Sequence, residues 1–149
     1  DLSLNQTVTL TFNDSAKFEC RWVYLKTSNK CIWTRGLKKI ISLPIAHGEG
    51  KFAVKNNQIL TKLMKNGQTV FKYVDSQGNE SAGYPYNPNG SVKNIAGICN
   101  PQGNILGMMP HPERFVTRYQ HPRWTRTPSL DLEGDGLAIF KNAVRGVAS

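Results

Sequence analysis

The chain has 149 residues, of which 39% are hydrophobic and 19% are charged. A chain of this length fits one globular domain with a sizeable core, and no apolar run approaches the roughly 20 residues that a membrane-spanning helix needs. Nineteen Lys and Arg stand against ten Asp and Glu, a formal charge of +9 that permits a polyanionic partner without establishing one.

The three cysteines show no CxxC spacing, so neither a disulfide framework nor a zinc site is indicated. No secretory signal pattern opens the chain. We therefore expect a soluble cytoplasmic protein with reduced thiols, without a membrane partner and without a metal in this domain.

The first third of the chain predicts strands. Thr7–Phe12 alternates β-branched and apolar residues, and Phe18–Leu25 places Phe18, Cys20, Trp22 and Tyr24 on one face, so two strands or a hairpin are expected. Ile40–Ala46 is a continuous apolar run, which is typical of a strand buried on both faces. It leads into the glycine-rich loop His47-Gly48-Glu49-Gly50.

The rest of the chain mixes helices and strands. Ile59, Leu60, Leu63 and Met64 predict one helical face, with Asn56 or Asn57 as the N-cap and Gly67 after the end. Further elements are expected as a strand at 68–74, a hairpin of 95–99 with 105–109, an aromatic and basic connection at 115–128, and a closing amphipathic helix at 135–145.

A histidine and a glutamate two residues apart follow the hairpin in Met109-Pro110-His111-Pro112-Glu113. The prolines hold Met109 and His111 extended, and residues i and i+2 of an extended chain point to the same side. Glu113 can then accept a hydrogen bond from one ring nitrogen and leave the other free for proton transfer, the base and orienting acid of a nucleophilic triad. A rigid structural turn is the alternative.

Several blocks of the sequence together resemble one family, the glutaminase subunits and domains of phosphoribosylformylglycinamidine synthases, which are class I (triad-type) glutamine amidotransferases. The resemblance extends from about Thr7 to Val147, and the blocks that carry it occur in order: Phe18–Val23, Leu43–Gly50, Asn87–Ser91, Ile95–Ile98 and Gly107–Arg114. It implies an α/β, flavodoxin-like class I amidotransferase fold.

That resemblance also implies a function. Glutamine would be hydrolysed and its ammonia passed to a synthase subunit or domain of the same enzyme, which would amidate formylglycinamide ribonucleotide in purine biosynthesis. ATP and magnesium would belong to that partner, and this domain would need no cofactor. His111 would be the catalytic base and Glu113 its orienting acid, while His47, Gly48 and Glu49 would line the glutamine pocket.

The family's nucleophile lies in a Gly-x-Cys-x-Gly elbow between a strand and a helix, and no such motif occurs in this chain. Gly97-Ile98-Cys99-Asn100 imitates its first half, but Pro101 occupies the second glycine position and another strand follows, so Cys99 is expected to be a core residue. We therefore expect residues 1–149 to be the C-terminal part of one amidotransferase domain, inactive alone, that lacks the N-terminal strands and the elbow.

Three other interpretations remain open. The chain can be a truncated homologue retained for binding. It can be a basic nucleic-acid-binding domain, because Arg21–Lys39 carries six basic residues and no acid, and Arg114–Arg126 carries four Arg together with Tyr119 and Trp124. It can be a metal hydrolase, and that interpretation rests on these candidate ligands: His47, Glu49, His111, Glu113 and His121.

Overall fold

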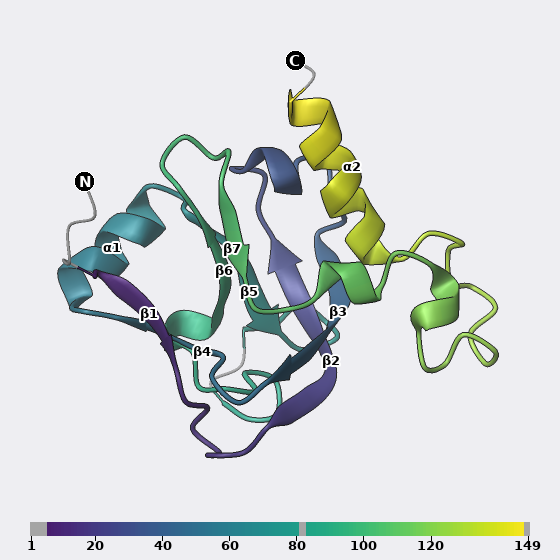
Figure 1. Cartoon of the computed structure of the whole chain (residues 1–149), viewed down its shortest axis with the longest axis horizontal. Coiled ribbons are helices and arrows are strands. Elements are labelled where there is room, and N and C mark those ends of the chain that lie inside the picture. Colours follow the sequence, from purple (N-terminus) through teal and green to yellow (C-terminus); the bar gives the residue numbers. More distant parts are fainter. Residues whose placement is uncertain (1–5, 81–82, 148–149) are drawn as a thin grey trace.

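A computed structural model describes residues 6–80 and 83–147, so both ends of the predicted 1–149 domain lie outside the described residues. Figure 1 shows the arrangement of the strands and helices. In chain order they are β1 (Val8–Thr11), β2 (Glu19–Thr27), β3 (Ile40–His47), β4 (Lys51–Val54), α1 (Asn57–Lys65), β5 (Thr69–Val74), β6 (Ile95–Cys99), β7 (Leu106–Met108) and α2 (Asp135–Val147). This mixed composition confirms the α/β class.

Two antiparallel sheets are formed. One has five strands in the order β3-β2-β5-β6-β7, and the other pairs β1 with β4. Of the two predicted outcomes for the first two segments, two strands are confirmed and their hairpin is not, because β1 pairs with β4, where Val8 faces Val54. The predicted hairpin of the two later strands is confirmed, with Gly97 facing Met108 in the β6 and β7 pair.

The strand buried on both faces is β5 and not β3 as predicted. β5 is the central strand of its sheet, and four of its six residues are buried. β3 is an edge strand in which buried and half-buried residues alternate. A continuous apolar run predicts that a strand is buried. The position of the strand in the sheet, central or at the edge, then decides whether one or both of its faces are buried.

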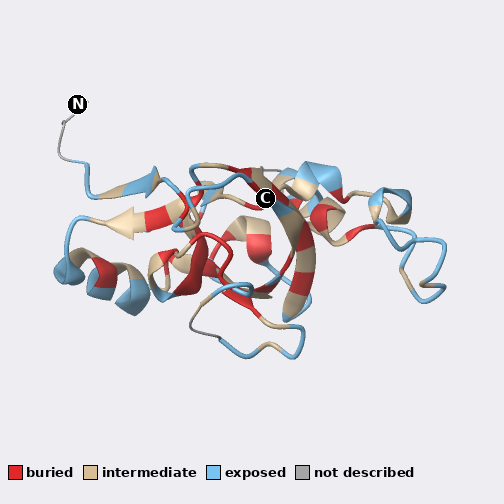
Figure 2. Cartoon of the chain, turned by 90° about the horizontal axis from the view of Figure 1, so that it is seen from below, coloured by how far each residue is buried: buried red, intermediate tan, exposed pale blue. Residues whose placement is uncertain are grey.

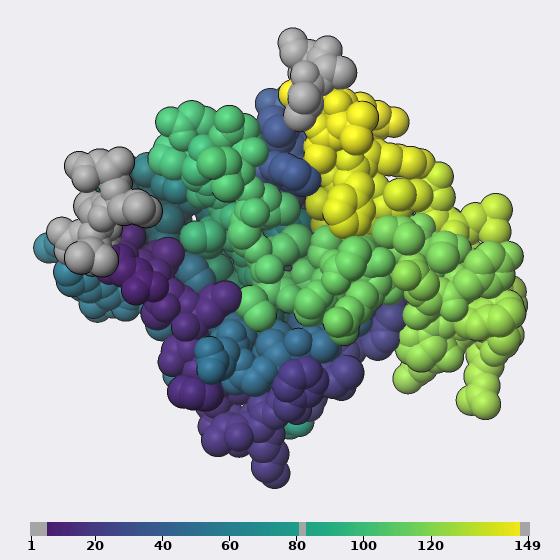
Figure 3. Space-filling model, in the orientation of Figure 1, coloured from purple at the N-terminus to yellow at the C-terminus, as the bar shows by residue number. Residues whose placement is uncertain are grey.

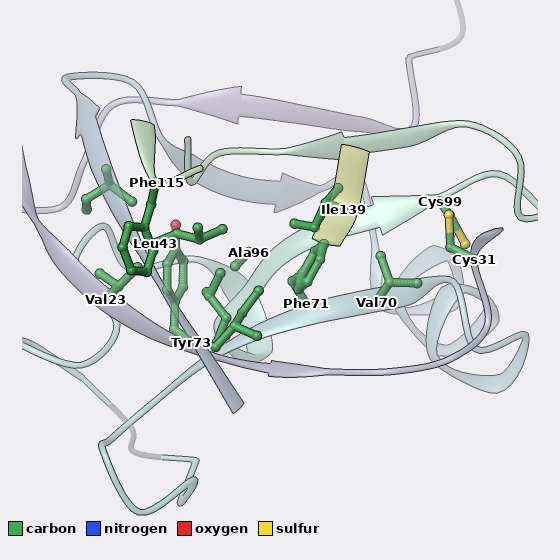
Figure 4. Close-up of a cluster of buried hydrophobic side chains, with 13 residues drawn as sticks. Val23, Cys31, Leu43, Val70, Phe71, Tyr73, Ala96, Cys99, Phe115 and Ile139 are labelled. Carbon is green, nitrogen blue, oxygen red and sulfur yellow. The ribbon is translucent and has the colours of Figure 1, made fainter. Parts of the chain in front are cut away.

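The main core lies between the five-stranded sheet and α2. This core contains Leu43 of β3, Tyr73 of β5, Ile139 of α2, and Phe115 from the segment between β7 and α2 (Figure 4). A smaller core under β1 and β4 collects Phe52, Leu60 of α1 and Ile95. Figure 2 shows buried residues in the middle of the molecule and mostly exposed or half-buried ones at the end formed by the segment before α2.

Helix α1 forms as its sequence predicts. Asn56 is its N-cap, with the side chain accepting a 3.0 Å hydrogen bond from the amide of Ile59, and Gly67 takes the left-handed conformation after its end at φ +67°. Among the described residues, neither helix has the length and apolar character of a membrane span.

One short segment shows how strongly the main sheet curls. The amide of Met109 donates to Ala96 of β6 at 3.1 Å, and two residues later the amide of His111 donates to Pro44 of β3 at 2.8 Å. β6 and β3 are separated by two strands in the sheet order, so the curl brings them close enough for one extended segment to bridge them.

Candidate active site

His111 and Glu113 form the contact that their spacing predicts. Nδ1 of His111 lies 2.7 Å from Oε1 of Glu113. An ionised carboxylate only accepts hydrogen bonds, so Nδ1 carries the proton and Nε2 is the unprotonated nitrogen of the neutral ring. Nε2 has no hydrogen-bond partner within residues 6–80 and 83–147, and 28% of the side chain is exposed. The pair therefore presents a base toward solvent.

The turn that carries this pair is held from two sides. His111 is bonded to the edge of β3 through Pro44, as described above. On the other side the amides of Gly134 and Gly136 donate to Val116 and Phe115 at 3.0 and 2.9 Å. A Cβ atom on Gly136 would lie 2.0 Å from the carbonyl oxygen of Pro112. Glycine at 136 thus lets the start of α2 approach the 3-10 turn Pro112–Arg114.

The side chain of His47 is buried and does not face solvent. It is 6% exposed, its Nδ1 lies 3.1 Å from Oδ1 of Asn13, and its Nε2 lies 3.4 Å from Nδ2 of Asn89. Burial lowers the pKa of His47, and the positive charge that His111 can carry lowers it further. His47 is thus a neutral internal side chain in the region of His111.

The loop after His47 is fixed by the same two asparagines. The amide of Gly50 donates to Oδ1 of Asn13 at 3.0 Å, and Nδ2 of Asn89 donates to the carbonyl of Gly50 at 2.8 Å. The remaining loop residues are outside this packing, with Gly48 half-buried and Glu49 exposed. Of the three residues predicted to line the glutamine pocket, Gly48 and Glu49 are accessible, whereas the side chain of His47 points into the packing beneath the loop; that the three line a pocket stays a prediction.

Sequence reasoning gave no role at His47 to four residues around it, namely Asn13, Tyr73, Asn89 and Ser91. The Tyr73 hydroxyl lies 3.2 Å from Nδ2 of Asn89, and burial raises its pKa. Ser91 donates to Oδ1 of Asn89 at 2.7 Å, and Asn13 donates to the carbonyl of His47 at 2.8 Å. Asn87–Ser91 stands out in the sequence as a turn and as a block of the family resemblance, but neither feature indicates a contact with His47. Nothing around Asn13 or Tyr73 indicates their partners, which lie 34 and 16 residues away.

The three cysteines are free thiols. Cys20 is exposed on β2, whereas Cys31 and Cys99 are buried with their sulfur atoms side by side (Figure 4). Burial raises the pKa of both buried thiols. The predicted burial of Cys99 in a strand is confirmed, at 3% exposure in β6.

The structure does not favour the metal-hydrolase interpretation. Within residues 6–80 and 83–147, no group of three or more His, Cys, Asp or Glu side chains is arranged to hold a metal ion. His121 instead packs against Trp22, with ring centroids 4.6 Å apart.

The acid-free run Arg21–Lys39 is partly neutralised by acids outside it. Arg21 pairs with Glu19 at 2.5 Å, Lys26 with Glu80 at 3.3 Å, and Lys38 with Asp131 at 2.8 Å. Half of its six basic side chains therefore contribute to internal ion pairs, which weakens the case for a nucleic-acid surface there.

Comparison with known proteins identifies relatives over nearly the whole chain. Phosphoribosylformylglycinamidine synthase subunit PurQ of Dehalococcoides mccartyi is 46% identical over 142 residues, covering 94% of this chain and 53% of the relative. The subunit of the same name from Archaeoglobus fulgidus is 47% identical over 140 residues, covering 91% of this chain and 49% of the relative. The chain thus spans about half the length of these curated relatives.

A solved structure shares the fold. A chain in the structure of PurLQS from Thermotoga maritima matches with a TM-score of 0.68 and 29% identity, covering 98% of this chain and 55% of that one. Residues 2–146 match the family described as CobB/CobQ-like glutamine amidotransferase domain. Because that match covers almost the entire sequence, the chain belongs to the CobB/CobQ-like glutamine amidotransferase domain family.

Proposed function

We propose that this chain is the C-terminal part of a glutaminase domain that releases ammonia from glutamine. The observation that carries the proposal is the 2.7 Å contact of His111 Nδ1 with Glu113 in a member of a glutamine amidotransferase family. The ammonia is consumed by an ATP-dependent synthase subunit of the same enzyme, which amidates formylglycinamide ribonucleotide. The names of the PurQ relatives support this assignment.

His111 moves the protons of the reaction. Its Nε2 accepts the proton of a cysteine thiol, and the thiolate attacks the amide carbon of glutamine. The C–N bond breaks as the imidazolium returns that proton to the leaving nitrogen, which frees ammonia and leaves a thioester. Nε2 then deprotonates a water molecule that hydrolyses the thioester to glutamate and the free thiol. Glu113 stabilises the imidazolium at each stage.

The cysteine comes from the rest of the domain. The chain covers about half of the PurQ relatives, and a raised pKa leaves Cys31 and Cys99 with little thiolate. The missing half would supply the strand-to-helix elbow with the thiol and, through the next backbone amide, one donor for the oxyanion.

Glutamine would be held by the loop that the asparagines fix. We assign Gly48 and Glu49 to the pocket through their backbone groups, with the side chain of His47 supporting the loop from inside. The domain needs no cofactor for this chemistry, because acyl transfer uses only the thiol, the base and water. ATP and magnesium belong to the synthase partner.

The test uses the full-length protein with its synthase subunit. With glutamine as nitrogen donor, His111→Ala should lower turnover on the order of 10³-fold or more. With ammonium as donor the same variant should keep its full rate, because the synthesis site is on the partner. Unchanged glutamine-dependent turnover in His111→Ala would refute the assignment, and so would glutaminase activity of the isolated 149-residue chain.

A further inference from the structure

The segment 117–128, here called the arginine lobe, projects from the body of the molecule beside the start of α2 (Figures 1 and 3). It contains Arg118, Arg123 and Arg126 and no acidic residue. Within the described residues, the side chains of Arg123 and Arg126 have neither an ion pair nor a hydrogen bond, and both residues are exposed. The lobe therefore presents two uncompensated positive charges at one end of the molecule.

Two large aromatic side chains accompany these charges. Tyr119 is 61% exposed and Trp124 is 41% exposed, and their rings meet edge to face with centroids 5.3 Å apart. Tyr, Trp and Arg are the residue types that dominate the binding energy of protein interfaces. Exposed apolar groups that lie together and are rimmed by polar residues are typical of protein interaction sites.

The lobe is held in shape by its own contacts. Arg118 donates to the carbonyls of Trp124 and Thr127 at 3.4 and 3.5 Å, and the side chain of Gln120 accepts from the amides of Val116 and Thr117 at 2.7 and 3.1 Å. At its base the ring of His121 packs on Trp22 and on Phe115. A rigid surface loses little conformational entropy on binding.

The lobe is also joined to the proposed catalytic pair. Nε2 of Gln120 donates to the backbone carbonyl of Glu113 at 3.3 Å. Tyr119 precedes Gln120 in the chain. A partner that contacts Tyr119 therefore lies close to the hydrogen bond between Gln120 and Glu113.

We propose that the arginine lobe docks into an acidic patch on the synthase subunit that consumes the ammonia. This rests on the proposed function, which requires such a partner. Charge complementarity supports an acidic site, with Arg123 and Arg126 pairing with carboxylates and the two rings filling apolar pockets between them.

The chemistry of the lobe fits a protein better than a nucleic acid. Single-strand binding uses successive free ring faces along a basic groove, whereas the edge-to-face pair of Tyr119 and Trp124 covers part of its own ring surface. Arg118 is already engaged within the lobe. The two unpaired side chains, Arg123 and Arg126, fit a small acidic site on a protein better than the extended phosphate backbone of a nucleic acid.

The experiment compares dissociation constants of the full-length protein and its synthase subunit at several ionic strengths. Arg123→Glu/Arg126→Glu and Tyr119→Ala/Trp124→Ala should each weaken the complex by roughly 10- to 100-fold. The charge effect should shrink with salt. The matched control is Lys62→Glu/Lys65→Glu, the same charge change on exposed residues of α1 at the other end of the molecule, and it should stay within about twofold.

Thermal unfolding of each variant shows whether it folds, and Arg123→Gln/Arg126→Gln provides a milder second test. Unchanged affinity in folded lobe variants would overturn the proposal. The proposal would also be overturned if the lobe variants lost binding to a single-stranded oligonucleotide but still bound the synthase subunit with unchanged affinity. If His111→Ala keeps its glutaminase activity while lobe variants still weaken the complex, the proposed function fails and the docking site stands.

Discussion

In the proposed mechanism Glu113 orients His111, and it does so from a partly exposed position. The carboxylate side chain is 55% exposed, so a water molecule can take its place when it is removed. We expect Glu113→Gln in the full-length protein to lower kcat/KM for glutamine by roughly 10- to 100-fold, less than His111→Ala. The ammonium-dependent rate should stay unchanged. Equal losses in the two variants would mean that the carboxylate does more than orient the ring.

His47 makes the stability of the fold depend on pH. Its pKa is lowered by burial, so between that value and the unfolded pKa of about 6.5 the unfolded chain binds more protons than the folded one. The free energy of unfolding should therefore be at its full value above pH 6.5 and fall as the pH drops below it. His47→Gln should flatten this dependence, apart from a part due to His121, whose pKa burial also lowers. Urea unfolding at a series of pH values measures both curves.

Gly50 is the residue on which the ring of His47 packs. A Cβ atom there would lie 2.2 Å from Cε1 of His47. We expect Gly50→Ala to displace the ring and destabilise the protein by about 1–3 kcal/mol. Gly48→Ala is the control, because a Cβ there meets no atom within 4 Å. Equal midpoints of urea unfolding for the two variants would contradict this packing argument.

The two histidine and glutamate pairs show what spacing can and cannot predict. Pro110 and Pro112 fix the backbone around His111, and the predicted contact forms, but Glu113 lies in the 3-10 turn Pro112–Arg114 and not in an extended chain. His47 and Glu49 have the same spacing, but His47 is the last residue of β3 and continues the buried series of Ile41, Leu43 and Ile45. The alternation of buried residues along β3 therefore places the side chain of His47 in the interior. This alternation predicts the orientation of His47 better than its spacing from Glu49 does.

At the scale of elements, the start of α2 positions the turn with the proposed catalytic pair. A side chain at 136 would collide with the backbone of Pro112. We expect Gly136→Ala to shift this turn and lower glutamine-dependent turnover by roughly 10-fold or more, since small displacements of catalytic groups are costly. Gly146→Ala near the other end of α2, where a Cβ would approach Ile32 at 3.0 Å, tests general helix disturbance. It should affect stability more than turnover.

Local signals predicted the elements better than their partners. The caps of α1, the period of α2 and the β6 and β7 hairpin are encoded within short stretches, and the structure confirms them. The pairing of β1 with β4 joins residues 40 to 46 positions apart. No local pattern predicts that β1 pairs with β4 and not with β2, its neighbour in the sequence, because β2 and β4 both offer suitable apolar residues.

At the scale of the whole molecule, an apolar groove of about 310 Å³ separates β1 from β6 and β7. It opens on the face of Figure 3, between the purple N-terminal strand and the green segment. Its lining comes from Val8–Leu10, Phe52, Ile95–Ile98 and Gly107–Met109. β7 forms the adjoining end of the five-stranded sheet. Such a surface invites association and, when left uncovered, aggregation.

If the proposed function holds, the open groove makes this chain a candidate half of a split glutaminase. This chain has its own core between the sheet and α2, so it can serve as one half of a fragment complementation pair, with the remainder of the full-length protein as the other. Co-expression of the halves should restore glutamine-dependent turnover that neither shows alone. Ile98→Asp in the groove should abolish reassembly, whereas Val144→Asp, 72% exposed on α2, should not. Glutaminase activity would then report the association of two polypeptides.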